Sequence, residues 1–155
     1  MKKIKMYLSI TLLTIAAGCS TATLINEAEK SVLLEHNIIT GTGGGFSGYY
    51  EGYDIDVVGN VNHWQGISYD RAKRIYVGSL GTTQIEKINS LISESDILNT
   101  QYDGKGNITT FITLKDSSKA HRISWAGISP DRKVPESIRD FNSRLNEIIT
   151  INSNY

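Results

Sequence analysis

The chain has 155 residues, of which 16 are basic, 16 are acidic and one is cysteine. This length suits one domain that buries a core without cross-links, and a single cysteine excludes a disulfide within the chain. The balanced charge argues against nucleic-acid binding, which depends on a concentrated basic face. It also argues against electrostatic binding to a membrane, so any membrane attachment would have to come from lipid.

The first 18 residues have the order that is typical of an export signal. Lys2, Lys3 and Lys5 form a positively charged start, and residues 7–17 are uncharged and mostly apolar. This apolar run of about eleven residues is much shorter than the roughly twenty that a membrane-spanning helix needs. A buried core helix is the alternative, but the run has no polar side that could face solvent.

The apolar run ends in Ala16-Ala17-Gly18-Cys19, which resembles the lipobox of bacterial lipoproteins. The resemblance implies a lipid on the Cys19 sulfur, cleavage after Gly18 and acylation of the freed amine, for example by palmitate. The sequence departs from the commonest pattern at Ala16, where leucine is more usual. Ordinary secretion with cleavage after Ala22 remains the alternative, although lipidation would account for a lone cysteine in an exported chain.

The resemblance predicts a signal peptide at 1–18. The composition of the later residues predicts a tether at 19–30, a single domain at 31–150 and a polar tail at 151–155. It implies a protein of the bacterial cell envelope that lipid on Cys19 holds to a membrane. Ser20 is compatible with delivery to the outer membrane, facing the periplasm, if sorting follows the usual Gram-negative pattern.

The first part of the domain is predicted to form strands. Residues 53–58 alternate between apolar side chains and Asp54 and Asp56, and we interpret the two aspartates as a solvated face. Gly59-Asn60 is typical of a two-residue hairpin turn. The expected strands here are 31–40, 53–58, 61–67 and 74–80.

Two helices are expected later in the chain, with strands at 107–114 and 119–125 between them. Thr83 and Glu86 have the spacing of a capping box at the start of the first helix, which should end near Ser95. Pro135 suits the first turn of the second helix. Each helix has one apolar stripe: Ile85, Ile88, Leu91 and Ile92 in the first, and Ile138, Phe141, Leu145 and Ile148 in the second.

This order of elements predicts an α+β fold: an antiparallel sheet of about five to six strands with two α-helices packed on one face. The order is weakly similar to that of small domains in bacterial envelope lipoproteins. That similarity rests on no chemical motif and implies no activity.

Residues 41–52 form the most unusual segment, because six of the twelve are glycine. Ordering so many glycines costs backbone entropy, which favours a loop, with a strand start at Tyr49 as the alternative. We interpret Phe46, Tyr49 and Tyr50 as candidate partner-binding residues on this loop, since exposed aromatic side chains are common in interfaces. The alternative is that the rings fold back onto the sheet. A glycine pattern at 43–48 matches that of dinucleotide-binding loops, but a strand rather than a helix is expected to follow it.

The remaining polar residues predict no metal site and no cofactor. His36, His63 and His121 are far apart in the sequence, and none has a second ligand at helical spacing. A calcium loop at 103–107 is disfavoured because Lys105 occupies a position that needs a ligand oxygen. No serine lies in the Gly-x-Ser-x-Gly pattern of a nucleophile elbow.

The sequence therefore favours a non-catalytic, lipid-anchored envelope protein that binds another envelope component, such as a protein. One alternative is an inhibitor or immunity-type protein acting through the glycine-rich loop at 41–52. Another is a small hydrolase, which would need a pocket joining His63 or His121 to a serine or a carboxylate.

Overall fold

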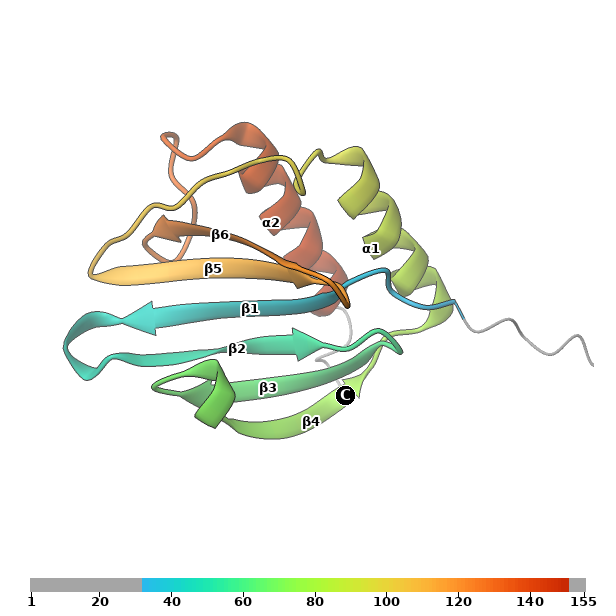
Figure 1. Ribbon diagram of the computed structural model, residues 1–155, viewed down its shortest axis with the longest axis horizontal. Coiled ribbons are helices and arrows are strands. Elements are labelled where there is room, and N and C mark those ends of the chain that lie inside the picture. The colour runs from blue at the N-terminus through green and yellow to red at the C-terminus, as the bar shows by residue number, and fades with distance from the viewer. Residues whose placement is uncertain (1–31, 151–155) are drawn as a thin grey trace, which may run out of the picture. The chain divides into compact units, whose positions relative to one another are not determined.

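The computed structural model describes residues 32–150, so the signal peptide, the tether with Cys19 and the polar tail that the sequence predicts lie outside the described residues. It contains a six-stranded antiparallel sheet in the order β4-β3-β2-β1-β5-β6, together with two helices (Figure 1). The strands are β1 Asn37–Gly44, β2 Tyr49–Ile55, β3 Asn60–Gly66, β4 Lys73–Ser79, β5 Ile108–Lys115 and β6 Ala120–Ala126; the helices are α1 Thr82–Glu94 and α2 Glu136–Thr150. Two short 3-10 helices, η1 Gly45–Ser47 and η2 Tyr69–Arg71, lie between strands. The predicted α+β fold is confirmed.

Both helices pack on one face of the sheet, where they form the main core. Alternate residues of the strands point to this face, because the side chains of a strand alternate between its two sides. Each large apolar side chain buried here stabilises the fold by about 1.5–3 kcal/mol relative to its exposed state. The sheet supplies Ile38, Ile55, Val61, Ile112, Leu114, Ile123 and Trp125, and the helices supply Ile85, Ile88, Leu91, Ile92, Ile138, Phe141 and Leu145.

The predicted apolar stripes of both helices are buried except for Ile148, which is partly buried while its neighbour Ile149 is buried. The start of α1 also differs from the prediction. Thr83 and Glu86 do not form the capping box, because α1 begins at Thr82 and Thr83 already lies inside it. Gly81 is the N-cap instead, and its main-chain N–H donates to the Gln84 side-chain oxygen at 2.9 Å. The helix ends at Glu94, beside the predicted Ser95.

The prediction of a loop is wrong for residues 41–44, because β1 continues to Gly44, whereas β2 does begin at Tyr49, the alternative strand start. The glycines are needed for packing in the sheet. A Cβ at Gly41 would lie 2.6 Å from ring carbons of both Trp64 and Phe111, so only glycine lets these rings lie against β1. The segment is thus a β-hairpin with a four-residue connection.

The face of the sheet opposite the helices carries a second, aromatic cluster. Trp64 and Phe111 are 1% and 4% exposed, with ring centroids 6.1 Å apart, and the Trp64 indole N–H donates to the main-chain oxygen of Thr40 at 2.9 Å. The guanidinium of Arg122 lies 3.6 Å from the centre of the Phe111 ring, which favours a cation–π contact. Both faces of the sheet are therefore partly covered by side chains.

The expectation that Asp54 lies on a solvated face is wrong, because Asp54 is buried on the same face as the aromatic cluster. Its carboxylate accepts hydrogen bonds from the Asn62 amide at 2.8 Å, the Tyr69 hydroxyl at 3.1 Å and the Arg74 guanidinium at 3.0 Å. The short helix η2 places Tyr69 over it. Asp56 is only partly buried, and it caps the turn between β2 and β3 by accepting from the Asn60 main-chain N–H at 2.9 Å.

Candidate functional site

The tip of the β1–β2 hairpin presents two of the three predicted partner-binding residues to solvent. Phe46 lies on η1 and is fully exposed, and Tyr49 is 46% exposed. Gly45, which precedes Phe46, and Gly48, which precedes Tyr49, have φ of +64° and +61°, a backbone conformation that glycine adopts without strain. Tyr50 is partly buried and turns back toward Phe111, with ring centroids 6.2 Å apart. Phe46 and Tyr49 are therefore the exposed aromatic residues of the tip, while Tyr50 packs against Phe111.

Three further exposed apolar residues lie at the same end of the sheet. Ile108 begins β5 and pairs with Gly44 at the end of β1. Ile67 directly follows Gly66, which pairs with Tyr50, and the main-chain N–H of Gly127, next to Ile128, donates to the Ile108 oxygen. We call these five residues the tip-end surface: Phe46, Tyr49, Ile67, Ile108 and Ile128.

The described chain begins at the opposite end of the sheet from this surface (Figure 1). The Leu34 main-chain N–H donates to the Val57 oxygen at 2.9 Å, which holds the first described residues beside the β2–β3 turn. From there β1 runs the full length of the sheet to the tip, a span of roughly 25 Å for eight strand residues.

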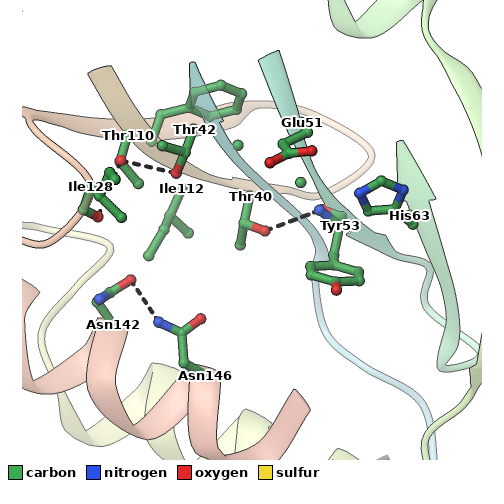
Figure 2. Close-up of a pocket in the computed structure, with 13 residues that line it drawn as sticks. Thr40, Thr42, Glu51, Tyr53, His63, Thr110, Ile112, Ile128, Asn142 and Asn146 are labelled. Carbon is green, nitrogen blue, oxygen red and sulfur yellow. Dashed lines mark hydrogen bonds between the residues drawn. The ribbon is translucent and has the colours of Figure 1, made fainter. Parts of the chain in front are cut away.

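A pocket of about 380 Å³ with polar and apolar lining opens between the sheet and α2, and Ile128 of the tip-end surface lines it (Figure 2). Its floor comes from β1, β2, β3 and β5, and Asn142 and Asn146 of α2 form the opposite wall. The Thr42 and Thr110 hydroxyls are 2.9 Å apart and hydrogen-bond each other. The Asn146 amide donates to the Asn142 side-chain oxygen at 3.3 Å, so part of the polar lining is already paired within the pocket.

His63 lies in this pocket together with Glu51, on neighbouring strands (Figure 2). The imidazole packs edge-on against the Tyr53 ring, with centroids 5.4 Å apart. An imidazole and a carboxylate in one pocket could hold a polar ligand or move a proton. The described residues that line the pocket include no serine to serve as a nucleophile.

The other histidines lie elsewhere. His121 is on β6 and His63 is on β3, and three strands of the sheet lie between β6 and β3. It lines a shallow pocket with Asp103 and Arg122, and His36 precedes β1. Within residues 32–150, His, Cys, Asp and Glu side chains form no group of three that could hold a metal ion. In that same range, no helix has the length and apolar character needed to cross a membrane.

The fold defines an α+β domain with an exposed apolar hairpin tip and a pocket beside it. Neither the known family models nor the curated proteins give a match to this sequence. The sequence could locate Phe46 and Tyr49 because they stand out among glycines. It could not locate Ile67, Ile108 and Ile128, because they lie in separate parts of the chain that only the strand order brings together.

Proposed function

We propose that this chain is a non-catalytic, lipid-anchored protein of the bacterial cell envelope whose domain binds another envelope component, a protein, through the tip-end surface. The anchor would be lipid on Cys19, as the resemblance to a lipobox implies. The observation that carries the binding role is the fully exposed Phe46 at the end of an ordered hairpin. A side chain in this position contributes little to the fold, so its apolar area is available to a partner.

The arrangement of the hairpin supports this role. The main-chain N–H of Gly45 donates to the Asn107 oxygen, so the tip is tied to the start of β5. Binding through an ordered tip costs less conformational entropy than binding through a flexible loop. The tip also lies at the opposite end of the sheet from the β2–β3 turn, beside which the Leu34 main-chain N–H donates to the Val57 oxygen.

Substitutions at the tip test the proposal. We expect Phe46→Ala combined with Tyr49→Ala to reduce recovery of the partner at least tenfold in an in-cell cross-linking pull-down, because truncating interface anchors typically costs about 2 kcal/mol or more. Val58→Ala is the matched control, since Val58 is 54% exposed at the opposite end of the sheet. Thermal unfolding should show that all variants keep the wild-type stability. Unchanged recovery with the double variant would contradict a role for the tip.

A second candidate function is that of an inhibitor or immunity-type protein, in which the partner that binds the tip is an enzyme. Deleting residues 46–50 would be a poor test of it, because the deletion removes Tyr50 and its contact with Phe111. The Phe46 and Tyr49 substitutions leave that contact in place. Loss of inhibition in the double variant with unchanged folding would support this form.

The hydrolase alternative has less support. His63 and the Glu51 carboxylate both line the pocket, as a hydrolase of the expected kind would require. However, Thr42 hydrogen-bonds Thr110, and Asn146 hydrogen-bonds Asn142, so these side chains are already paired with one another. The described residues that line the pocket also include no serine or cysteine that could act as a nucleophile. Binding through the tip-end surface therefore accounts for more of the structure.

A further inference from the structure

The pocket between the sheet and α2 has an unbalanced charge. Its described lining includes the Glu51 carboxylate and neither lysine nor arginine. Glu51 forms no ion pair within residues 32–150. An anionic ligand would therefore meet a like charge without an opposite one, whereas a cation would gain a carboxylate that the fold leaves available.

The hydrogen bonds around Thr42 show where its hydroxyl proton points. The Thr110 hydroxyl donates its single proton to the main-chain oxygens of Gly127 and Ile128, at 2.7 and 3.2 Å. Thr110 can therefore only accept in its 2.9 Å hydrogen bond with Thr42, so the Thr42 hydroxyl is the donor there (Figure 2). The Thr42 oxygen has no second proton, and it lines the pocket as an acceptor.

Thr42 and Glu51 form a pair of acceptors on neighbouring strands. They lie directly opposite each other on β1 and β2. Side chains in such a pair have Cβ atoms about 4.5–5.5 Å apart, so one small group can contact both. That group must supply protons to both side chains, since neither has one to give. A primary ammonium carries three N–H donors and a positive charge, whereas a hydroxyl carries one donor and no charge.

We propose that this pocket binds an alkylammonium group, whose N–H donors contact Glu51 and Thr42. An alkylammonium also has an aliphatic stem, which needs apolar surface beside the acceptors. Ile112 and Ile128 supply that surface in the lining of the same pocket. The acceptor pair and the apolar side chains therefore match the two parts of one ligand.

The opposite wall of the pocket suits an amide next to the stem. Asn142 and Asn146 lie there on α2 (Figure 2). Because the Asn146 amide donates to the Asn142 oxygen, the Asn142 N–H groups and the Asn146 oxygen remain for a ligand. A lysine side chain with its neighbouring peptide groups combines an ammonium, an aliphatic stem and amides. The same ammonium could also come from a free amine, and the probes below distinguish these two sources.

Nuclear magnetic resonance titrations of the full chain in detergent micelles test the proposal. Nα-acetyl-lysine amide is the probe, and Nα-acetyl-norleucine amide is the same molecule without the ammonium. We expect the lysine probe to shift the resonances of the pocket residues with a dissociation constant of about 1 mM, as is typical of a ligand with about 13 heavy atoms. The norleucine probe should bind at least threefold more weakly. These probes are added to the chain alone, so the result does not depend on the partner proposed for the tip.

Butylamine, which has the ammonium and the stem but no amide, distinguishes the two sources. Binding as tight as that of the lysine probe would assign the pocket to free amines. Weaker binding would assign it to the lysine side chain of a peptide or protein.

Matched variants assign the binding to the acceptor pair. Glu51→Gln keeps the shape of the side chain and removes its charge, and it should weaken binding of the lysine probe at least threefold, as is reasonable for an exposed ion pair. Glu86→Gln removes the same charge from the exposed side of α1 and should leave the affinity unchanged. Thr42→Val should weaken binding and Thr42→Ser should retain it. Circular dichroism verifies that each variant folds.

Several results would overturn the proposal. Equal affinity for the lysine and norleucine probes would show that the ammonium is not recognised. Unchanged affinity in Glu51→Gln, or an equal loss in Glu86→Gln, would show that Glu51 is not its partner. Resonance shifts confined to residues outside the pocket, or no shift with the lysine probe at ten times the expected dissociation constant, would exclude the site itself.

Discussion

Gly41 shows how one residue without a side chain supports the packing of two aromatic ones. It lies in the central strand β1, under the rings of both Trp64 and Phe111. Its backbone is not in the left-handed region, so its role is spatial and not conformational. Gly48 is the opposite case, because its φ is +61° and no atom lies within 4 Å of a Cβ placed there.

We expect Gly41→Ala to lower the free energy of unfolding by about 1–3 kcal/mol, because overpacking forces rings or backbone to shift. Urea unfolding measures this loss. Adding Phe111→Leu should recover part of it by making room, which a double-mutant cycle would show as coupling between the two sites. Gly48→Ala should cost about 1 kcal/mol through its backbone alone and show no coupling to Phe111→Leu. Strict additivity at Gly41 and Phe111 would contradict the packing role.

At the scale of elements, one carboxylate helps to hold the turn between β5 and β6, which the Asp116 main-chain N–H also closes by donating to the Lys119 oxygen at 3.0 Å. Asp116 accepts hydrogen bonds from the Lys119 main-chain N–H at 2.8 Å, and from the Ser118 main-chain N–H and hydroxyl at 2.6 and 2.8 Å. The Lys119 and Ser118 donors lower the pKa of Asp116 from 3.8 to about 2. These bonds hold Asp116 in its charged form and fix the turn.

This shift predicts a pH dependence of stability. Because the pKa of Asp116 is lower in the folded than in the unfolded chain, its contribution is complete above about pH 4 and disappears as the pH falls through about 2. Asp116→Asn should therefore lose less stability than the wild type between about pH 4 and pH 2, as urea unfolding across that range can measure. Ser117→Ala, in the same turn, should keep the wild-type profile. Parallel profiles for Asp116→Asn and the wild type would contradict the assignment.

The helices and the later strands could be predicted because their signals are local. Apolar stripes identified both helices, and the strands expected at 61–67, 74–80, 107–114 and 119–125 became β3 to β6. The β1–β2 hairpin could not be predicted, since the reason for its glycines lies in Trp64 and Phe111, which are distant in the sequence. The burial of Asp54 was missed for the same reason, because Tyr69 and Arg74 reach it from other elements.

At the scale of the whole molecule, one sheet carries two separate clusters of buried side chains and an exposed hairpin tip. The helices and one face enclose the main core, and the aromatic cluster covers part of the other face. The hairpin tip lies at one end of the strands, at the opposite end from the β2–β3 turn.

The chain has two tryptophans, and each is buried in a different cluster: Trp125 among the helices and Trp64 on the opposite face. Their intrinsic fluorescence therefore reports separately on the two faces of the same sheet. We expect Trp64→Phe and Trp125→Phe to give single-emitter proteins whose fluorescence changes at the same urea concentration as the circular dichroism of each variant. Coincident transitions would show that both faces unfold as one cooperative unit. A Trp64 signal lost at lower urea, before the helices melt, would show instead that the aromatic face opens while the main core stays folded.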